Sequence, residues 1–178
     1  MAKYESLPTT AINPDQTTLP SHNLPELVHL DDPATAVMTD FTHTPAHIIS
    51  PNKSMDDALN EMKATGAHLL LAIDQEGHLR GIISSEDILG EKPIQIIQEK
   101  RISRDNIKVD MLMRSAEHIF ALNIETIDDA RVGHIVKTLT ENKRQYALVI
   151  GKSKSDNQTM IRGLFTLSQI SKQLHMDL

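Results

Sequence analysis

The chain has 178 residues, a net charge of −6 and no cysteine. Without cysteine it cannot form disulfides, a thiolate metal site or a cysteine nucleophile. Nucleic-acid binding relies on basic phosphate contacts and aromatic stacking, so an acidic chain with 3% aromatic residues is a poor candidate for it. No apolar run approaches the roughly 20 residues that span a bilayer, and the first residues lack an apolar signal-peptide core. We therefore expect a cytoplasmic protein without nucleic-acid or membrane partners.

Proline and glycine are segregated along the chain. Five of the eight prolines fall within the first 33 residues, whereas the first glycine is Gly66. Since proline fixes φ and biases the preceding residue away from helix, residues 1–35 are predicted to form an extended, proline-rich arm. Leu24, Leu27, Val28 and Leu30 are the apolar exception, and they could pack against the body or against a partner chain.

From about residue 36 onward the chain has the pattern of a duplication, which is sought early because it decides the fold. Two segments that begin at Met55 and Val132 carry apolar residues at the spacing of one buried helical face. Similar pentapeptides, residues 54–58 and 126–130, open with a hydroxyl residue that has Asp three positions on. Ser54 and Thr126 are therefore predicted to be the N-caps of the two helices.

Each predicted helix is followed by two apolar strands and a second helix. The strands are expected at 69–73 and 78–83 in the first copy and at 146–150 and 160–165 in the second, with short leading strands near 48–49 and 119–121. Each unit is too small to bury its sheet alone, so the two copies should share a core. The prediction is an α/β (α+β) fold of two strand–helix–strand–strand–helix repeats, residues 36–98 and 99–178, with a further helix after Pro93.

The segment Gly81-Ile-Ile-Ser-Ser-Glu-Asp87 has a partial copy, Gly163-Leu-Phe-Thr-Leu-Ser-Gln169. With the repeated element order, these residues make the chain resemble a CBS domain pair (Bateman module) over about residues 36–175. The resemblance implies tandem βαββα repeats related by a pseudo-twofold axis, with two clefts between them. It also implies a stand-alone regulatory module that binds an adenosine nucleotide, is not an enzyme and acts on an unknown partner protein. Family members pair as homodimers through helices, for which Ile96, Ile97, Ile170 and Leu174 are the candidates.

The resemblance also implies a ligand site. Asp87 would accept hydrogen bonds from both ribose hydroxyls, because an ionised carboxylate offers two acceptor oxygens. Ser84 and Ser85 would line the phosphate side, and Gly81 would let backbone and ligand approach closely. The expected ligands are AMP, ADP, ATP or S-adenosylmethionine, with no cofactor required. The other residues implied at this site are His68, Ser115, Ala116, Ile119, Phe120, Ala121, Ala147 and Leu148.

The same residues have an explanation that needs no ligand, because Ser84 and Asp87 have the spacing of a helix capping box. In the second copy Gln169 could still cap a helix, but it cannot act as a charged double acceptor. A second, degraded site is therefore expected, made of Thr166, Gln169, Arg144 and Thr39, although a solvated charge is the favoured explanation of Arg144. The alternative function is a ligand-free scaffold for dimerisation or protein interaction.

Metal and catalytic chemistry have little support in the sequence. Nine histidines are present, but Pro45 separates His43 from His47 and the others lack ligand spacing. Ser84, Ser85 and Asp87 supply part of a hydrolytic set without a histidine that the sequence places beside them. No metal site and no catalytic residue are expected.

Overall fold

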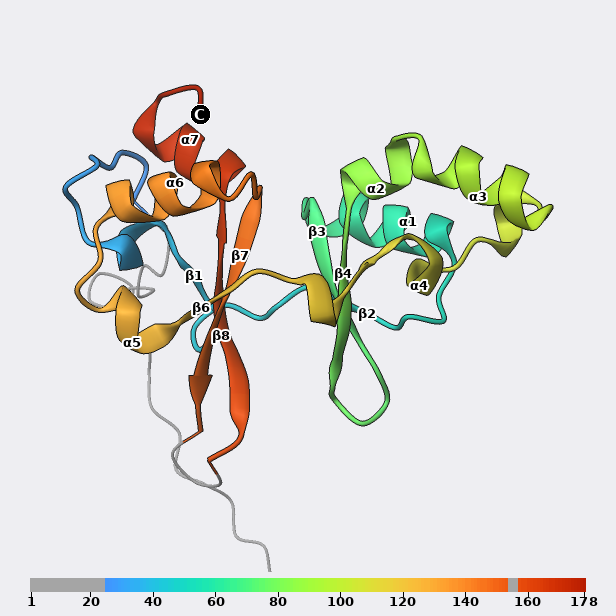
Figure 1. Cartoon of the computed structure of the whole chain (residues 1–178), viewed down its shortest axis with the longest axis horizontal. Helices are drawn as coiled ribbons and strands as arrows, with labels where there is room; N and C mark the ends of the chain where they lie inside the picture. Colours follow the sequence, from blue (N-terminus) through green and yellow to red (C-terminus); the bar gives the residue numbers. More distant parts are fainter. Residues whose placement is uncertain (1–24, 154–156) are drawn as a thin grey trace, which may run out of the picture.

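The computed structural model describes residues 25–153 and 157–178. Figure 1 shows two lobes side by side, each with a small sheet and helices packed along it. Both sheets have four strands, with an antiparallel hairpin of two long strands in the middle. The predicted α/β (α+β) class and the tandem repeats are confirmed.

The first lobe contains the sheet ordered β2-β3-β4-β5. The parallel pair β2–β3 is joined through a helix, as a parallel crossover requires. Its strands are β2 (Ile48–Ile49), β3 (Leu69–Ile73), β4 (Leu79–Ser84) and β5 (Arg114–Ser115). Its helices are α1 (Met55–Thr65), α2 (Ser85–Leu89), α3 (Lys92–Lys100), the 3-10 turn η2 (Arg104–Asn106) and α4 (Val109–Leu112).

The second lobe contains the sheet ordered β1-β8-β7-β6. It repeats the first lobe in element order, and its central hairpin is longer. Its strands are β1 (Thr39–Asp40), β6 (Ala121–Asn123), β7 (Tyr146–Lys152) and β8 (Thr159–Thr166). Its helices are the 3-10 turn η1 (Ala34–Val37), α5 (Ile124–Ile127), α6 (Val132–Glu141) and α7 (Leu167–Leu174), and the 3-10 turn η3 (Ala116–His118) precedes β6.

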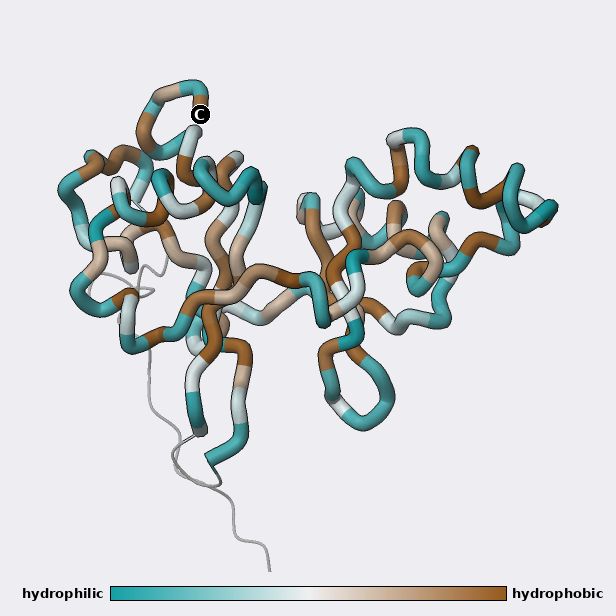
Figure 2. The backbone as a smooth tube through the Cα atoms, in the orientation of Figure 1, coloured by the Kyte–Doolittle hydropathy of each residue, from teal (hydrophilic) through white to brown (hydrophobic). Residues whose placement is uncertain are grey.

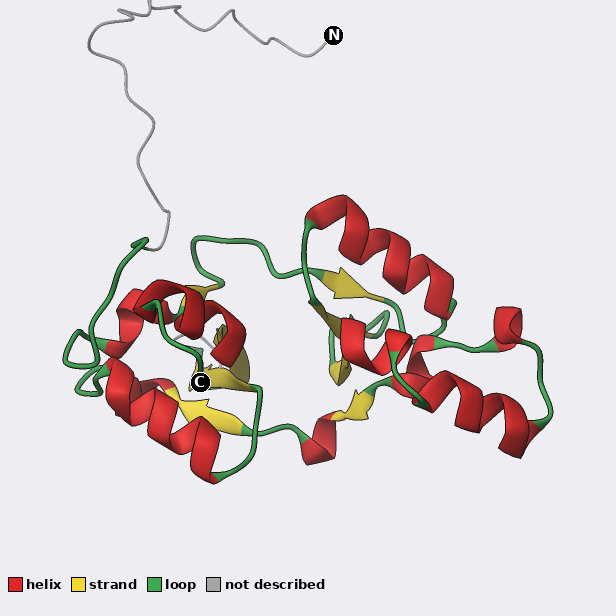
Figure 3. Cartoon of the chain, turned by 90° about the horizontal axis from the view of Figure 1, so that it is seen from above, coloured by secondary structure: helices red, strands yellow, loops and turns green. Residues whose placement is uncertain are grey.

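The lobes exchange their leading strands. β1 comes first in the chain but pairs with β8 of the second lobe, and β5 pairs with β4 of the first lobe. Residues 41–47 and 116–120 therefore cross between the lobes, as Figure 3 shows from above. Each lobe thus contains a strand from the other half of the chain. The division of the sequence into repeats at 36–98 and 99–178 stays a prediction.

The register of the second repeat differs from the prediction. Ser54 caps α1 as expected, with a reciprocal hydrogen-bond pair to Asp57. Thr126, however, lies inside α5, where its hydroxyl donates to the Asn123 carbonyl 2.7 Å away. The equivalent helix α6 begins five residues later than the pentapeptide suggested, and the His134 side chain accepts from the Arg131 amide. The prediction that Thr126 is the N-cap of this helix was wrong.

Residues 25–37 pack onto the second lobe. Val28 is buried in the core of that lobe, whereas Leu27 and Leu30 are exposed. The carbonyls of Leu30 and Asp32 accept the first free amides of α6, from Gly133 and Val132. This part of the predicted arm is thus docked on the body, while Leu24 and the rest of residues 1–24 lie outside the described residues.

Each lobe has its own core beneath its helices, and a third cluster lies between the sheets. Leu71 and Ile82 of the first lobe and Leu148 of the second form this shared cluster. Figure 2 shows hydrophobic residues concentrated along the central strands. Ile170 and Leu174, expected at a dimer contact, are buried in the core of the second lobe and are not available for one. Within the described ranges, no helix is both long and apolar enough to cross a membrane.

Candidate functional site

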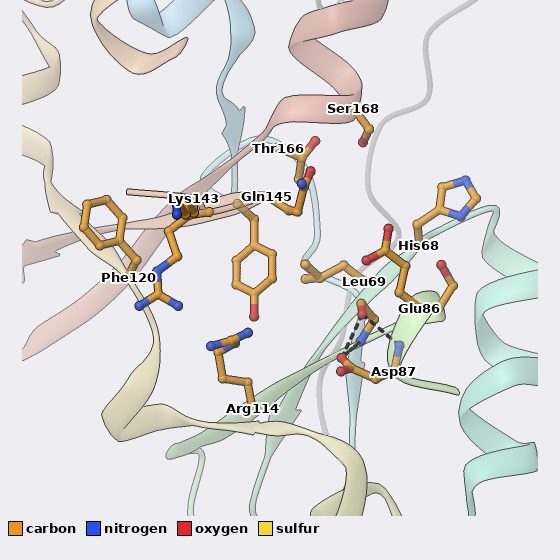
Figure 4. A pocket seen from close by; sticks show the side chains of 14 residues that line it. His68, Leu69, Glu86, Asp87, Arg114, Phe120, Lys143, Gln145, Thr166 and Ser168 are labelled. Atoms are coloured by element: carbon orange, nitrogen blue, oxygen red, sulfur yellow. Dashed lines mark hydrogen bonds between the residues drawn. The ribbon is translucent and has the colours of Figure 1, made fainter. Parts of the chain in front are cut away.

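Two clefts open between the lobes, and the first contains Asp87. We call it the Asp87 cleft. It is formed by the start of α2, by β5 and by the loop that leads into β7 (Figure 4). Its lining residues are His68, Leu69, Ser84, Ser85, Glu86, Asp87, Arg114, Phe120, Lys143, Arg144, Gln145, Tyr146, Thr166 and Ser168.

The second cleft, which we call the Gln169 cleft, is made by the equivalent elements of the other halves. It combines the start of α7 with β1 and with the loop that leads into β3. His68, Leu69, Thr166 and Ser168 line both clefts. The remaining lining residues are Thr39, Phe41, Thr44, Pro45, His47, Thr65, Gly66, Ala67, Leu71, Leu164, Gln169 and Lys172.

Asp87 is held in place by three groups. Its Oδ2 accepts from the backbone amide of Ser84 at 2.9 Å and from the Ser84 hydroxyl at 2.7 Å. Its Oδ1 pairs with the ammonium group of Lys92 from α3. The Ser84 hydroxyl accepts from the Asp87 amide in return, which confirms the predicted capping box. The carboxylate remains 17% exposed and faces the cleft.

The loop opposite Asp87 is basic. Lys143 and Arg144 line the Asp87 cleft, whereas Gly66 and Ala67 hold the equivalent positions in the Gln169 cleft. Lys143 has φ of 51°, the left-handed conformation that Gly66 adopts in the first repeat. That conformation costs a side-chain-bearing residue roughly 1 kcal/mol or more, and Arg101 and His175 adopt it as well where α3 and α7 end. Lysine at this position is a departure from what the turn alone would favour.

Arg114 and Tyr146 meet on another wall of the Asp87 cleft. Burial raises the pKa of the Tyr146 hydroxyl above its ordinary value of 10.0, while the Arg114 guanidinium and its hydrogen bond to that hydroxyl oppose the rise. Phe120 and Leu69 add apolar surface beside this pair. The cleft therefore combines two carboxylates, a cluster of cations and aromatic walls.

The Gln169 cleft differs in chemistry. Among the described residues that line it none is acidic. The Gln169 amide group is engaged with Thr39 at 3.4 Å and with Gln173 at 3.3 Å. Thr166 caps α7 by accepting from the Gln169 amide, but the Gln169 side chain bonds Thr39 and Gln173 instead of completing a capping box.

The structure brings part of the predicted site together. Asp87, Ser84, Ser85, His68 and Phe120 line the Asp87 cleft, and Thr39, Thr166 and Gln169 line the other. Arg144 was expected at the second site and instead lines the first, because the loop before β7 faces α2 across the lobes. The predicted residues absent from both linings are Gly81, Ser115, Ala116, Ile119, Ala121, Ala147 and Leu148.

Three of these absences have clear causes. Ala147 and Leu148 are buried in the sheet, so the residue before them, Tyr146, supplies the wall. The space beside Gly81 is filled by the crossing strand at Met113 and Arg114. Sequence reasoning missed Arg114, Lys143 and Tyr146 as lining residues. The basic run 143–144 just before an apolar strand was a signal for Lys143, and no comparable signal marked the other two. The other missed lining residues of this cleft are Leu69, Glu86, Gln145 and Ser168.

One group of side chains elsewhere has the geometry of a metal site. In the described part of the chain, Asp74, Glu76 and His78 each place one ligand atom within 4.8 Å of the others. Both oxygens of Asp74 are already used, one by the amides of the turn and the other by Arg80 at 2.6 Å. The His78 amide and the Arg80 guanidinium hold the pKa of Asp74 below its usual value. These contacts fix the β3–β4 hairpin.

The chain is similar to known proteins in sequence over one repeat and in fold over most of its length. The family model for the CBS domain matches residues 36–93. An uncharacterized conserved protein from Pyrococcus horikoshii is 19% identical, with a TM-score of 0.58 over 85% of this chain and 98% of that one.

Two further structures share the fold. CBSX2 in complex with AMP is 21% identical, with a TM-score of 0.54 over 79% of this chain and 94% of that one. CBSX2 is described in another structure as a CBS-pair protein from Arabidopsis thaliana. The CBS domain of a bacterial CNNM/CorC family Mg²⁺ transporter is 14% identical, with a TM-score of 0.54 over 84% and 80% of the two chains. Among curated protein sequences no match was found.

Proposed function

Residues 36–93 match the CBS domain and the fold is that of CBS-pair structures, so we propose that the chain is a non-catalytic regulatory module that binds an adenosine nucleotide in the Asp87 cleft. One observation carries the proposal: a carboxylate and several cations line the same cleft, while the equivalent cleft has glutamine, glycine and alanine in the corresponding places.

The groups of the Asp87 cleft suit the parts of a nucleotide. The carboxylate of Asp87 would accept from both ribose hydroxyls. Lys143, Arg144 and Arg114 would pair with phosphate oxygens, which arginine can bind through two parallel hydrogen bonds. Phe120 and Tyr146 offer aromatic surface for the base. That CBSX2 was crystallised with AMP supports a mononucleotide as the ligand.

The charge of the cleft ranks the candidate ligands. The cleft is lined by three cations and by two carboxylates, Glu86 and Asp87. The cations would attract the phosphates of AMP, ADP and ATP, and they outnumber the carboxylates that could attract the sulfonium of S-adenosylmethionine. We therefore propose a nucleotide as the ligand and place S-adenosylmethionine last. The regulated protein is unknown, and a cytoplasmic location remains a prediction.

Calorimetric titration with AMP, ADP, ATP and S-adenosylmethionine tests the proposal on protein freed of co-purified ligand. Asp87→Ala should weaken nucleotide binding by about 1.5 to 3 kcal/mol, the range for hydrogen bonds to a charged group. Asp57→Ala is the matched control, since it removes the equivalent capping-box aspartate of α1, which lines neither cleft. Silence with all four compounds would reject the proposal.

A second candidate function is a ligand-free scaffold, and exposed apolar side chains favour it. Leu89 at the end of α2 is 69% exposed and Ile94 on α3 is 59% exposed, on adjoining helices. Such a surface could join two copies of the chain into the expected homodimer. Light scattering at tens of micromolar with wild type and Ile94→Asp would test it, and a monomeric wild type would count against it.

A further inference from the structure

Among the described residues, Lys92 is the one hydrogen-bond partner of Asp87 that lies outside α2 and its N-cap. It lies at the start of α3, and its ammonium group also reaches the Leu112 carbonyl at the end of α4, 3.3 Å away. Three helices of the first lobe are thereby tied together at the edge of the cleft. The Lys92 side chain is 48% exposed, so it can exchange this pairing for water at small cost.

The hydrogen-bonding capacity of Asp87 is nearly filled. A carboxylate has about four acceptor positions. On Asp87 the amide and hydroxyl of Ser84 take two of them and Lys92 takes a third. A ribose presents two neighbouring hydroxyl donors, so one existing partner must leave before both can bind.

Lys92 is the partner most easily released. The Ser84 amide and hydroxyl both belong to the α2 capping box, and the part-buried hydroxyl also accepts from the Asp87 amide. The ammonium group of Lys92 can be solvated, since half of its side chain is already in water. Its release would free α3 from α2 and from α4, two residues before Arg114 in the cleft wall.

We propose that Lys92 is a latch, displaced from Asp87 when a ribose-bearing ligand binds, which transmits occupancy of the cleft to α3. This rests on the proposed nucleotide function. In this proposal α3, which carries the exposed Ile94, has two states: one with the Lys92–Asp87 ion pair and one without it. The ligand binds the state without the ion pair more tightly, and a switch requires such a difference in affinity.

Titrating AMP into wild type, Lys92→Met and Lys92→Arg tests the latch, with hydrogen exchange of residues 92–100 measured with and without AMP. Lys92→Met should bind AMP about two- to tenfold more tightly, because the ligand no longer has to break the Lys92–Asp87 interaction. That interaction should contribute between an exposed ion pair and a hydrogen bond to a charged group. AMP should speed exchange in α3 of wild type and of Lys92→Arg but not of Lys92→Met, in which α3 is already released.

The outcomes separate the two proposals. If wild type binds AMP but Lys92→Met binds equally or more weakly, the latch is wrong and the nucleotide site stands. If only Lys92→Met binds, the latch is supported in its strongest form. If none of the three proteins binds AMP or another adenosine nucleotide, the nucleotide function is wrong and the latch falls with it.

Discussion

A Cβ atom on Gly81 would lie 2.5 Å from the carbonyl oxygen of Arg114, closer than real side chains come to a backbone. The second repeat shows the same relationship, since a Cβ on Gly163 would lie 2.7 Å from the Thr39 carbonyl. In both lobes glycine makes room for the strand that arrives from the other half. The repeated glycine therefore has a structural reason, and at Gly81 that reason also positions Arg114 in the Asp87 cleft.

Gly81→Ala should destabilise the protein by about 1 to 3 kcal/mol, the usual cost of overpacking a closely fitted site. Because β5 would have to move, the variant should also lose affinity for any ligand that contacts Arg114. Urea unfolding gives the first quantity and AMP titration the second. Leu89→Ala, at an exposed position, is the control and should change stability by no more than roughly 0.5 kcal/mol. A Gly81→Ala variant as stable as wild type would refute this account of the strand crossing.

The register of the second repeat can be checked with two hydroxyl residues. Ser54→Ala removes the α1 cap and should cost about 0.5 to 2 kcal/mol of unfolding free energy. Thr126→Ala removes only a hydroxyl that donates within α5 and should cost less. Chemical denaturation of both variants measures the difference. An equal or larger loss for Thr126→Ala would favour the register in which Thr126 is a cap.

Gln173 ties the N-terminal segment to the Gln169 cleft. Its side chain is 6% exposed, donates to the Pro25 carbonyl at 2.7 Å and the Ala36 carbonyl at 3.3 Å, and accepts from Gln169. Gln173→Met would leave these buried groups unpaired and should cost about 1 to 3 kcal/mol. Thermal unfolding measures the loss, and limited proteolysis should show faster cleavage near residues 25–32. Unchanged proteolysis there would show that Gln173 does not hold the segment.

Tyr146 provides a spectroscopic test of the cleft wall. Its pKa is raised by burial, so the folded chain keeps the proton to higher pH than the unfolded chain. The associated stability is complete below the ordinary pKa of 10.0 and is lost as pH rises through the folded value. Phenolate absorbance of a Tyr4→Phe variant, which leaves Tyr146 as the sole tyrosine, should titrate above the ordinary value.

Replacing Arg114 with Met in that background should raise the pKa of Tyr146 further, because the guanidinium opposes the effect of burial. A Tyr146 that titrates at or below its ordinary value would mean that the hydroxyl is open to water. The predicted wall of the Asp87 cleft would then be wrong.

The long apolar strands and the first-repeat helix could be predicted from the sequence, because β3 and β7 are continuous apolar runs and α1 has the spacing of one buried helical face. The exchange of β1 and β5 could not, since two-residue strands carry no pattern and their partners lie far away in the chain. The Asp-Asp-Ala similarity misplaced the second helix. The helices, which start at Met55 and Val132, have the same offset in sequence as the strand residues Ile73 and Ile150, and the Asp-Asp-Ala segments have a smaller one.

The site shows the same division. Ser84 and Asp87 were found because a capping box and a ribose site require the same residues at the same spacing. The placement of Arg144 with Asp87 depends on how the two lobes face each other, which local sequence does not encode. Lys143 became notable only through its left-handed backbone, where the first repeat has Gly66.

The central claim is that the Asp87 cleft alone binds the nucleotide, and amide chemical-shift mapping during an AMP titration tests it most directly. We expect shifts at residues 84–87 and 143–146, with Phe41 and Gln169 unmoved and one AMP bound per chain. Shifts centred on Phe41 and Gln169, or shifts that persist unchanged in Asp87→Ala, would contradict the claim.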